Sequence, residues 1–183
     1  MKSITPVIIG ANGWLSQVAQ QLLKQHNRYS SPVVFGSTAS TVYQNGTTIY
    51  PLSLASDILL SNSPPSEFVF LNFAYLTKDK VDRRQHSEYQ RLLNILNKSI
   101  ADLIVNLKPA SCLFMSSGAA SMVENNQAET EEMRIYGEQK LSDERFFGDI
   151  CTQNNVKFLA PRLYSIGGPF VNKVRLYALS NFI

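Results

Sequence analysis

A tyrosine and a lysine stand four residues apart in the segment Ile135-Tyr-Gly-Glu-Gln-Lys140. Residues four apart share one face of a helix, so the Lys140 ammonium can lie close to the Tyr136 ring. A nearby cation favours the phenolate and lowers the pKa of a tyrosine, which is ordinarily near ~10. Such a phenol can exchange a proton with a substrate alcohol or carbonyl near neutral pH. The same spacing also occurs by chance on surface helices, so its meaning depends on the segments that precede it.

Two earlier segments supply that context. The turn Gly10-Ala-Asn-Gly13 follows a short apolar run and precedes a helical pattern. It therefore puts backbone N–H groups at a helix N-terminus, where a pyrophosphate binds well. Glycine allows the tight turn and the close approach of backbone to phosphate, although a plain tight turn would look the same. Ser117 ends a later apolar run, at the sheet edge where ligands bind in open α/β folds. In this order, the turn, the serine and the Tyr/Lys pair indicate redox chemistry on a nicotinamide cofactor.

The elements that would position these residues alternate along the chain. Short apolar runs typical of buried strands occupy residues 6–9, 32–35, 47–50, 68–71, 112–115 and 156–160. Helical spacing of apolar residues is found at 14–25 and 84–107, and a polar loop at 123–132 leads into a helix that holds Tyr136 and runs to residue 154. This alternation predicts an α/β fold, with a doubly wound parallel sheet of Rossmann type and helices on both faces. We expect residues 1–183 to form one NAD(P)-binding domain.

The composition excludes several classes of function. The net charge is only +3 and the charges are scattered, so we expect no nucleic-acid partner. Cys112 and Cys151 lack metal-ligand spacing, and His26 and His86 are isolated, so no metal site is expected. We interpret the cysteines as reduced thiols of a cytoplasmic protein. The apolar N-terminal run is too short for a signal peptide or a membrane span.

Taken together, the motifs resemble those of the extended short-chain dehydrogenase/reductase family, also called the NAD-dependent epimerase/dehydratase family. The resemblance runs over nearly the whole chain. The segment from Val7 to Leu15 is similar to the family's Gly-x-x-Gly-x-x-Gly opening, with Ser16 in the place of the third glycine. The other similar segments are Asn72-Phe-Ala74, Asn94 in its helix, Ser116-Ser-Gly-Ala119, Tyr136-Gly-Glu-Gln-Lys140, and Ala160-Pro-Arg-Leu-Tyr-Ser-Ile-Gly-Gly-Pro169.

The resemblance implies NAD or NADP as cofactor, a nucleotide-sugar substrate and a homodimer. It implies that Tyr136 is the general acid/base, that Ser117 orients the substrate oxygen, and that Lys140 holds the nicotinamide ribose and lowers the Tyr136 pKa. The implied cofactor-binding residues are Gly10, Asn12, Gly13, Trp14, Leu15, Ser37, Asn72, Ala74, Asn94, Tyr136 and Lys140. The second strand ends in Gly36-Ser-Thr38, with neither an acid for the adenosine ribose nor an Arg for a 2′-phosphate. The choice between NAD and NADP therefore stays open.

Departures from the family pattern reduce the number of activities that we expect. Gly118 and Ala119 follow Ser117 where the dehydratases have an Asp-Glu pair, which leaves an epimerase or a reductase. Ser165 and Gly167 depart from the segment associated with nucleotide-sugar recognition. The chain ends at Ile183, where family members continue into a substrate-binding lobe, so we expect a C-terminally short form.

Two alternatives to an enzyme follow. One is a truncated, catalytically inactive remnant that still binds a dinucleotide. The other is a redox-sensing regulator, a class that usually lacks the Tyr/Lys pair. We expect the homodimer to form through the helices at 84–107 and 136–154, because the first carries apolar residues on more than one face.

Overall fold

The computed structural model describes residues 4–26, 29–61, 67–75, 86–164 and 170. The strands are β1 (Ile4–Ile9), β2 (Val33–Gly36), β3 (Val42–Gln44), β4 (Thr47–Pro51), β5 (Glu67–Asn72), β6 (Ser111–Phe114), β7 (Ser116–Ser117), β8 (Lys157–Leu159) and β9 (Arg162–Leu163). The helices are α1 (Trp14–Gln25), α2 (Ala55–Ser61), α3 (His86–Leu107), α4 (Gly118–Glu124) and α5 (Glu131–Gln153), with a 3₁₀ turn η1 (Leu52–Leu54) before α2. The predicted alternation of strands and helices is confirmed.

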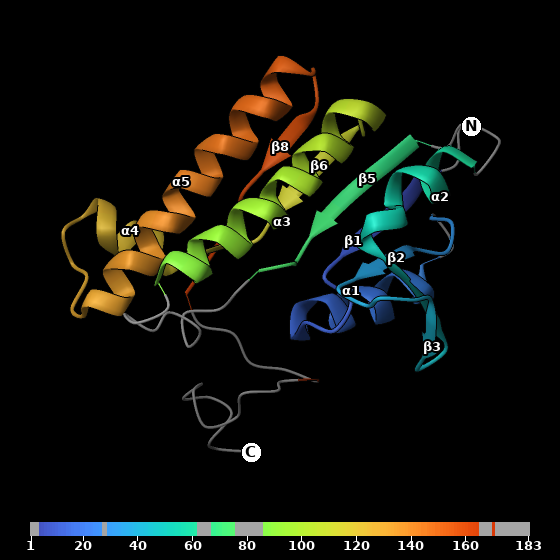
Figure 1. Ribbon diagram of the computed structural model, residues 1–183, viewed down its shortest axis with the longest axis horizontal. Coiled ribbons are helices and arrows are strands. Elements are labelled where there is room, and N and C mark those ends of the chain that lie inside the picture. Colours follow the sequence, from blue (N-terminus) through green and yellow to red (C-terminus); the bar gives the residue numbers. More distant parts are fainter. Residues whose placement is uncertain (1–3, 27–28, 62–66, 76–85, 165–169, 171–183) are drawn as a thin grey trace.

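Seven of these strands form one sheet in the order β3-β4-β2-β1-β5-β6-β8. Its strand pairs are parallel except β3 with β4, so the predicted α/β fold with a parallel sheet is confirmed. The chain first adds strands on one side of β1 and then returns to add β5, β6 and β8 on the other side (Figure 1). Ile9 pairs with Phe35 on β2 and with Asn72 on β5, so these three strands end at the same edge. This edge is a topological switch point, where open α/β sheets bind ligands.

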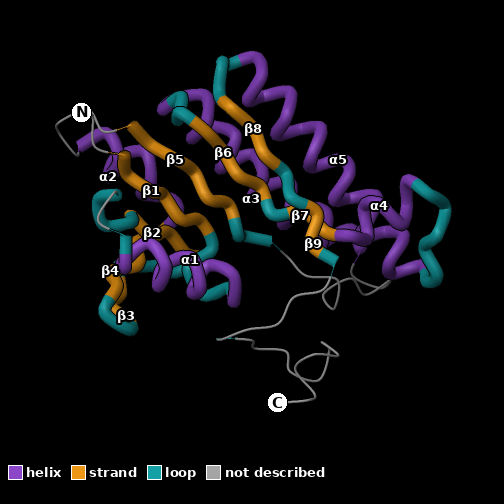
Figure 2. The backbone as a smooth tube through the Cα atoms, turned by 180° about the vertical axis from the view of Figure 1, so that it is seen from behind, coloured by secondary structure: helices purple, strands orange, loops and turns teal. Residues whose placement is uncertain are grey.

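Helices cover both faces of the sheet. Figures 1 and 2 show α2, α3 and α5 on one face and α1 on the other. The alternation of side chains along β1 matches this arrangement, because Val7 and Ile9 join the main core while Ile8 joins a smaller cluster that includes Leu23 of α1. The main core also buries the free thiol of Cys112, on β6. In the described part of the chain, no helix is long and apolar enough to cross a membrane.

Several elements differ from the prediction. The β3–β4 hairpin was not predicted, although Asn45 and Gly46 both have positive φ (50° and 72°), as the tight turn of a two-residue hairpin requires. The predicted loop at 123–132 begins inside the unpredicted helix α4 and ends inside α5. Helix α5 begins at Glu131 because the Thr130 hydroxyl accepts a hydrogen bond from the Met133 amide (3.1 Å). The first two residues of the predicted helix at 84–107 lie outside the described residues.

Candidate active site

The glycine turn after β1 packs backbone to backbone against the turn after β5. Gly10 has a φ of +101°, and a Cβ built there would lie 2.6 Å from the Ala74 nitrogen. The Phe73 amide donates to the Ile9 carbonyl (2.8 Å), which holds the second turn against the first. Gly13 begins α1 without a capping side chain, so the dipole at this helix N-terminus remains available to a ligand anion.

A cavity of about 250 Å³ lies at this edge of the sheet. It is lined by the glycine turn (residues 9–13), the tip of β2 (35–37) and the turn after β5 (73–75), together with Leu52 and Leu96. It therefore contains a helix N-terminus for phosphate and apolar side chains that suit a planar base.

The lining fits the adenosine-diphosphate part of a dinucleotide. Of the predicted cofactor-binding residues, five line the cavity: Gly10, Asn12, Gly13, Ser37 and Ala74. Glycine at position 10 lets the two turns that line the cavity pack closely, because a Cβ there would overlap the Ala74 backbone. Beside Ser37, the Thr38 hydroxyl is buried and has no hydrogen-bond partner in the part of the chain described, which leaves a polar group available to a ribose or its phosphate. These features are compatible with a pyrophosphate at the glycine turn, and its role in binding an anion stays a prediction.

The other predicted cofactor-binding residues that precede Tyr136 do not line the cavity. Trp14, the first residue of α1, is buried, and Leu15 is half-buried. Asn72 is buried and supports the lining, since its Oδ1 accepts from the Ala74 amide (3.1 Å). Asn94 is exposed on α3. The buried asparagine of that helix is Asn97, which donates to the Asp143 carboxylate (2.7 Å).

Lys140 is enclosed rather than exposed, with 2% of its surface accessible. Its ammonium donates to the Met115 carbonyl (2.8 Å) and lies 3.3 Å from the centre of the Tyr75 ring. The centres of the Phe114 and Tyr136 rings are 4.6 Å and 5.9 Å away. Tyr136 meets Tyr75 edge to face, with ring centres 5.8 Å apart. The expected proximity of Tyr136 and Lys140 is present, but Tyr75 lies against both and is itself part of the cavity wall.

Burial dominates the electrostatics of this cluster. It lowers the pKa of Lys140 to about 7, while the nearby Asp143 and Glu144 carboxylates act in the opposite direction. Burial also raises the pKa of Asp143, although hydrogen bonds from Gln139 and Asn97 and the charge of Lys140 oppose that shift. The pKa of Tyr75 is raised far above its ordinary value, first by burial and then by the Asp143 charge. Tyr75 is therefore a neutral phenol with its hydroxyl end near Asp143.

The two serines of β7 are held by structural interactions. Ser117 begins α4, and its hydroxyl accepts from the Ala119 amide (3.2 Å). Ser116 donates to Glu144, which also binds the Arg162 guanidinium (2.7 Å). Arg162 lies on β9, which pairs in parallel with β7, so this ion pair fixes the segment that carries Ser117. Neither serine lines the cavity.

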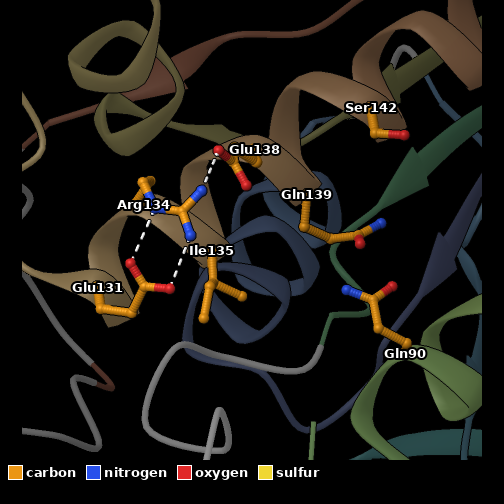
Figure 3. Close-up of a pocket in the computed structure, with 7 residues that line it drawn as sticks. All are labelled: Gln90, Glu131, Arg134, Ile135, Glu138, Gln139 and Ser142. Atoms are coloured by element: carbon orange, nitrogen blue, oxygen red, sulfur yellow. Dashed lines mark hydrogen bonds and ion pairs between the residues drawn. The ribbon is translucent and has the colours of Figure 1, made fainter. Parts of the chain in front are cut away.

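A larger groove of about 440 Å³ lies between α3 and α5, away from the glycine turn (Figure 3). Its charges are paired internally, because Arg134 binds both Glu131 (2.7 Å) and Glu138 (2.6 Å). The amides of Gln90 and Gln139 approach each other across it (Figure 3). Among the described residues, no cluster of His, Cys, Asp and Glu could hold a metal ion.

Several residues that form the site were not predicted from the sequence. Phe35, Leu52, Tyr75 and Leu96 all line the cavity but were not predicted. For Tyr75 a signal existed, because it immediately follows the Asn72-Phe-Ala74 segment that was assigned to the cofactor. The segment containing Ser165 and Gly167 lies outside the described residues.

No protein-family model and no curated protein sequence matches the chain. Solved structures match it in fold. The UDP-N-acetylglucosamine 4-epimerase from Bacillus cereus superposes with a TM-score of 0.64 at 16% identity, covering 98% of this chain and 66% of that one. The UDP-glucose 4-epimerase from Thermotoga maritima, solved with UDP-glucose, has a TM-score of 0.67 at 14% identity, covering 90% of this chain and 57% of that one.

The chain has the fold of the extended short-chain dehydrogenase/reductases. A GalE-like L-threonine dehydrogenase from Cupriavidus necator, in its holo form, also superposes, with a TM-score of 0.66 at 13% identity. That match covers 86% of this chain and 54% of the dehydrogenase. The fold expected from the sequence resemblance is thus confirmed. The chain spans between about half and two thirds of the length of these three proteins.

Proposed function

We propose that the chain binds NAD or NADP at the glycine turn and acts as an epimerase or reductase on a nucleotide-activated sugar. The observation that carries the proposal is the position of Tyr75. It lines the cavity at the switch point and also contacts Tyr136 and Lys140, so the predicted acid/base pair lies one side chain from the predicted cofactor site. Two of the proteins with the same fold are UDP-sugar 4-epimerases, which supports the substrate class.

In this proposal each of the chain's own residues has a distinct role. The glycine turn and the N-terminus of α1 would hold the pyrophosphate. A bound nicotinamide would supply the hydride chemistry. Tyr136 would give a proton to, or take one from, the substrate oxygen, and the positive charge of Lys140, 5.9 Å from its ring centre, would stabilise the phenolate. Ser117 would orient the same oxygen. To do so, its hydroxyl would have to release the hydrogen bond that it accepts from the Ala119 amide.

A second candidate is a chain that binds a dinucleotide without turnover. It is favoured by the enclosure of Lys140, whose ammonium is bonded to the Met115 carbonyl and covered by the Tyr75 ring. It is also favoured by the use of the Ser117 hydroxyl as a helix cap. Both candidates share the dinucleotide site and differ only in the chemistry at Tyr136.

Calorimetric titration with NAD⁺ and NADP⁺ tests the shared part. Assays of UDP-, dTDP- and GDP-sugars for epimerisation and for NAD(P)H-linked reduction then separate the candidates. Tyr136→Phe should leave cofactor affinity nearly unchanged and lower turnover about 10²–10⁴-fold, the usual contribution of general acid–base catalysis. Tyr43→Phe is the matched control, because Tyr43 is 77% exposed on the edge strand β3. A Tyr136→Phe variant as active as wild type would refute the catalytic assignment, and binding with no turnover would select the second candidate.

We also propose a homodimer through α3 and α5. Leu92 and Ile95 on α3 are 42% and 51% exposed, and Phe146 on α5 is 40% exposed. Large apolar side chains exposed on two adjacent helices form a surface that a second copy could cover, and burying it yields about 25 cal/mol per Å².

A further inference from the structure

We propose that Tyr75 determines which part of a dinucleotide this chain recognises: the cavity binds the adenosine-diphosphate portion, and the Tyr75 ring keeps the Lys140 ammonium from the ribose beyond it. This inference rests on the dinucleotide site of the proposed function. It concerns a residue that no predicted motif contained.

The first argument is the shape of the cavity. The glycine turn, the β2 tip and Leu52 supply its adenosine and pyrophosphate side, and Tyr75 stands in its wall. Neither Lys140 nor Tyr136 lines it. A ligand that follows the lining therefore reaches the Tyr75 ring before it reaches the ammonium.

The second argument is the bonding of the ammonium itself. Lys140 has three N–H donors. One is used by the Met115 carbonyl at 2.8 Å, and the Tyr75 ring covers the ammonium at 3.3 Å. The Phe114 ring follows at 4.6 Å. Because a cation is attracted to the face of an aromatic ring, this arrangement holds the ammonium inside the protein without any ligand.

The third argument is that the Tyr75 ring is fixed from several sides. It packs edge to face against Phe114 (6.3 Å between centres) and Tyr136 (5.8 Å). Its hydroxyl is buried at the Asp143 end of the cluster, where Asn97 and Gln139 hold the carboxylate. These contacts come from α5 and β6 as well as from the β5 turn, so the ring is a built part of the site and not a surface side chain.

The test compares ADP, which lacks the second ribose, with ADP-ribose and NAD⁺ by calorimetry. If NADP⁺ binds more tightly than NAD⁺, each of the three ligands is replaced by its form that carries a 2′-phosphate on the adenosine ribose. In the wild-type protein we expect dissociation constants for the three ligands within about threefold of one another. In Tyr75→Ala, ADP-ribose and NAD⁺ should gain about tenfold over ADP, since a hydrogen bond to a charged group is typically worth a factor of this size.

Two further variants make the comparison specific. Tyr75→Phe keeps the ring and should retain the wild-type ratio of ADP-ribose to ADP affinity. Lys140→Met should leave that ratio unchanged in the wild-type background and should remove the gain in the Tyr75→Ala background. Such a double-mutant cycle assigns the gain to the ammonium and not to cavity enlargement. If Tyr75→Ala fails to fold, the Lys140→Met comparison in the wild-type background still decides.

The inference is overturned if ADP-ribose binds the wild-type protein at least tenfold more tightly than ADP and Lys140→Met abolishes that advantage. It is also overturned if a folded Tyr75→Ala has the wild-type ratio. Either result leaves the dinucleotide site standing. Absence of binding by every ligand of the series would overturn both the inference and the proposed function.

Discussion

Gly10 and Gly13 occupy the same turn but are required for different reasons, and alanine substitutions should separate folding from binding. At Gly10 the φ of +101° is one that alanine rarely adopts, and the added Cβ would lie 2.6 Å from the Ala74 nitrogen. At Gly13 the φ is −69°, and the nearest atom to an added Cβ is the Gly10 carbonyl oxygen at 3.5 Å. The first substitution meets fixed backbone, whereas the second meets ordinary van der Waals distances.

The expected cost of Gly10→Ala follows from two terms. An unfavourable backbone conformation costs of order 1–3 kcal/mol. Forcing an extra carbon against packed atoms costs typically about 1–3 kcal/mol more. The neighbouring turn cannot easily yield, since the Phe73 amide is bonded to Ile9 and the Ala74 amide to Asn72. The sum, about 2–6 kcal/mol, corresponds to a decrease in Tm of roughly 5–20 °C for a domain of this size.

Gly13→Ala should behave in the opposite way. Alanine adopts a φ of −69° without strain but is a poorer helix N-cap than glycine, so the two effects oppose each other and stability should change by no more than about 1 kcal/mol. Dinucleotide affinity should nevertheless fall, because the new methyl group lies beside the helix N-terminus that is proposed to hold the pyrophosphate. Urea unfolding and scanning calorimetry measure the stability, and titration with NAD⁺ and NADP⁺ measures the affinity. A Gly10→Ala variant as stable as wild type would refute the packing argument, and an unimpaired affinity in Gly13→Ala would refute the position of the pyrophosphate.

Three other predictions concern charge and assembly. Since the pKa of Lys140 is lowered from 10.5 to about 7, the unfolded chain binds more protons between these values. The unfolding free energy of wild type should therefore rise, relative to Lys140→Met, from pH 7 to 9.5 in urea titrations, and a flat difference would contradict this. Ser37→Asp should weaken NADP⁺ binding more than NAD⁺ binding in calorimetry, because a carboxylate repels a 2′-phosphate; equal losses would place the ribose elsewhere. Ile95→Lys should convert the proposed dimer into a monomer in sedimentation, whereas a monomeric wild type would refute that interface.

The sequence was sufficient to predict the elements whose signals are local. The apolar positions of residues 14–25 recur at helical spacing, and α1 has these bounds. The glycine turn is likewise a local feature, because its position between a strand and a helix is visible in the residue types. The β3–β4 hairpin was missed although its signal, Asn45-Gly46, is local too. There the edge strand is short and its residues are mostly exposed, so no apolar run marked it.

The environment of the Tyr/Lys pair could not be predicted in the same way. Spacing along α5 determines that Tyr136 and Lys140 share a face, but not what covers that face. Lys140 is covered by Tyr75, from the turn after β5, and by Phe114, from β6. These contacts arise from the order of strands in the sheet, which joins segments distant in sequence. The same holds for Asn97, whose burial depends on the packing of α3 against Asp143 of α5.

A motif that matches in residue type and spacing is therefore only part of an acid/base site. The reacting groups must also be accessible to the ligand, and the lysine must carry its positive charge. Lys140 has the right neighbour in Tyr136, yet its burial lowers its pKa to about 7, which disfavours its positive charge near neutral pH. The carboxylates of Asp143 and Glu144 oppose this effect, which ties the charge beside Tyr136 to the buried polar network of α3 and α5. The Tyr75 ring stabilises that charge and at the same time separates it from the cavity. One aromatic side chain thus acts on both halves of the proposed function, and removing it tests whether the Lys140 ammonium can reach a ligand in the cavity.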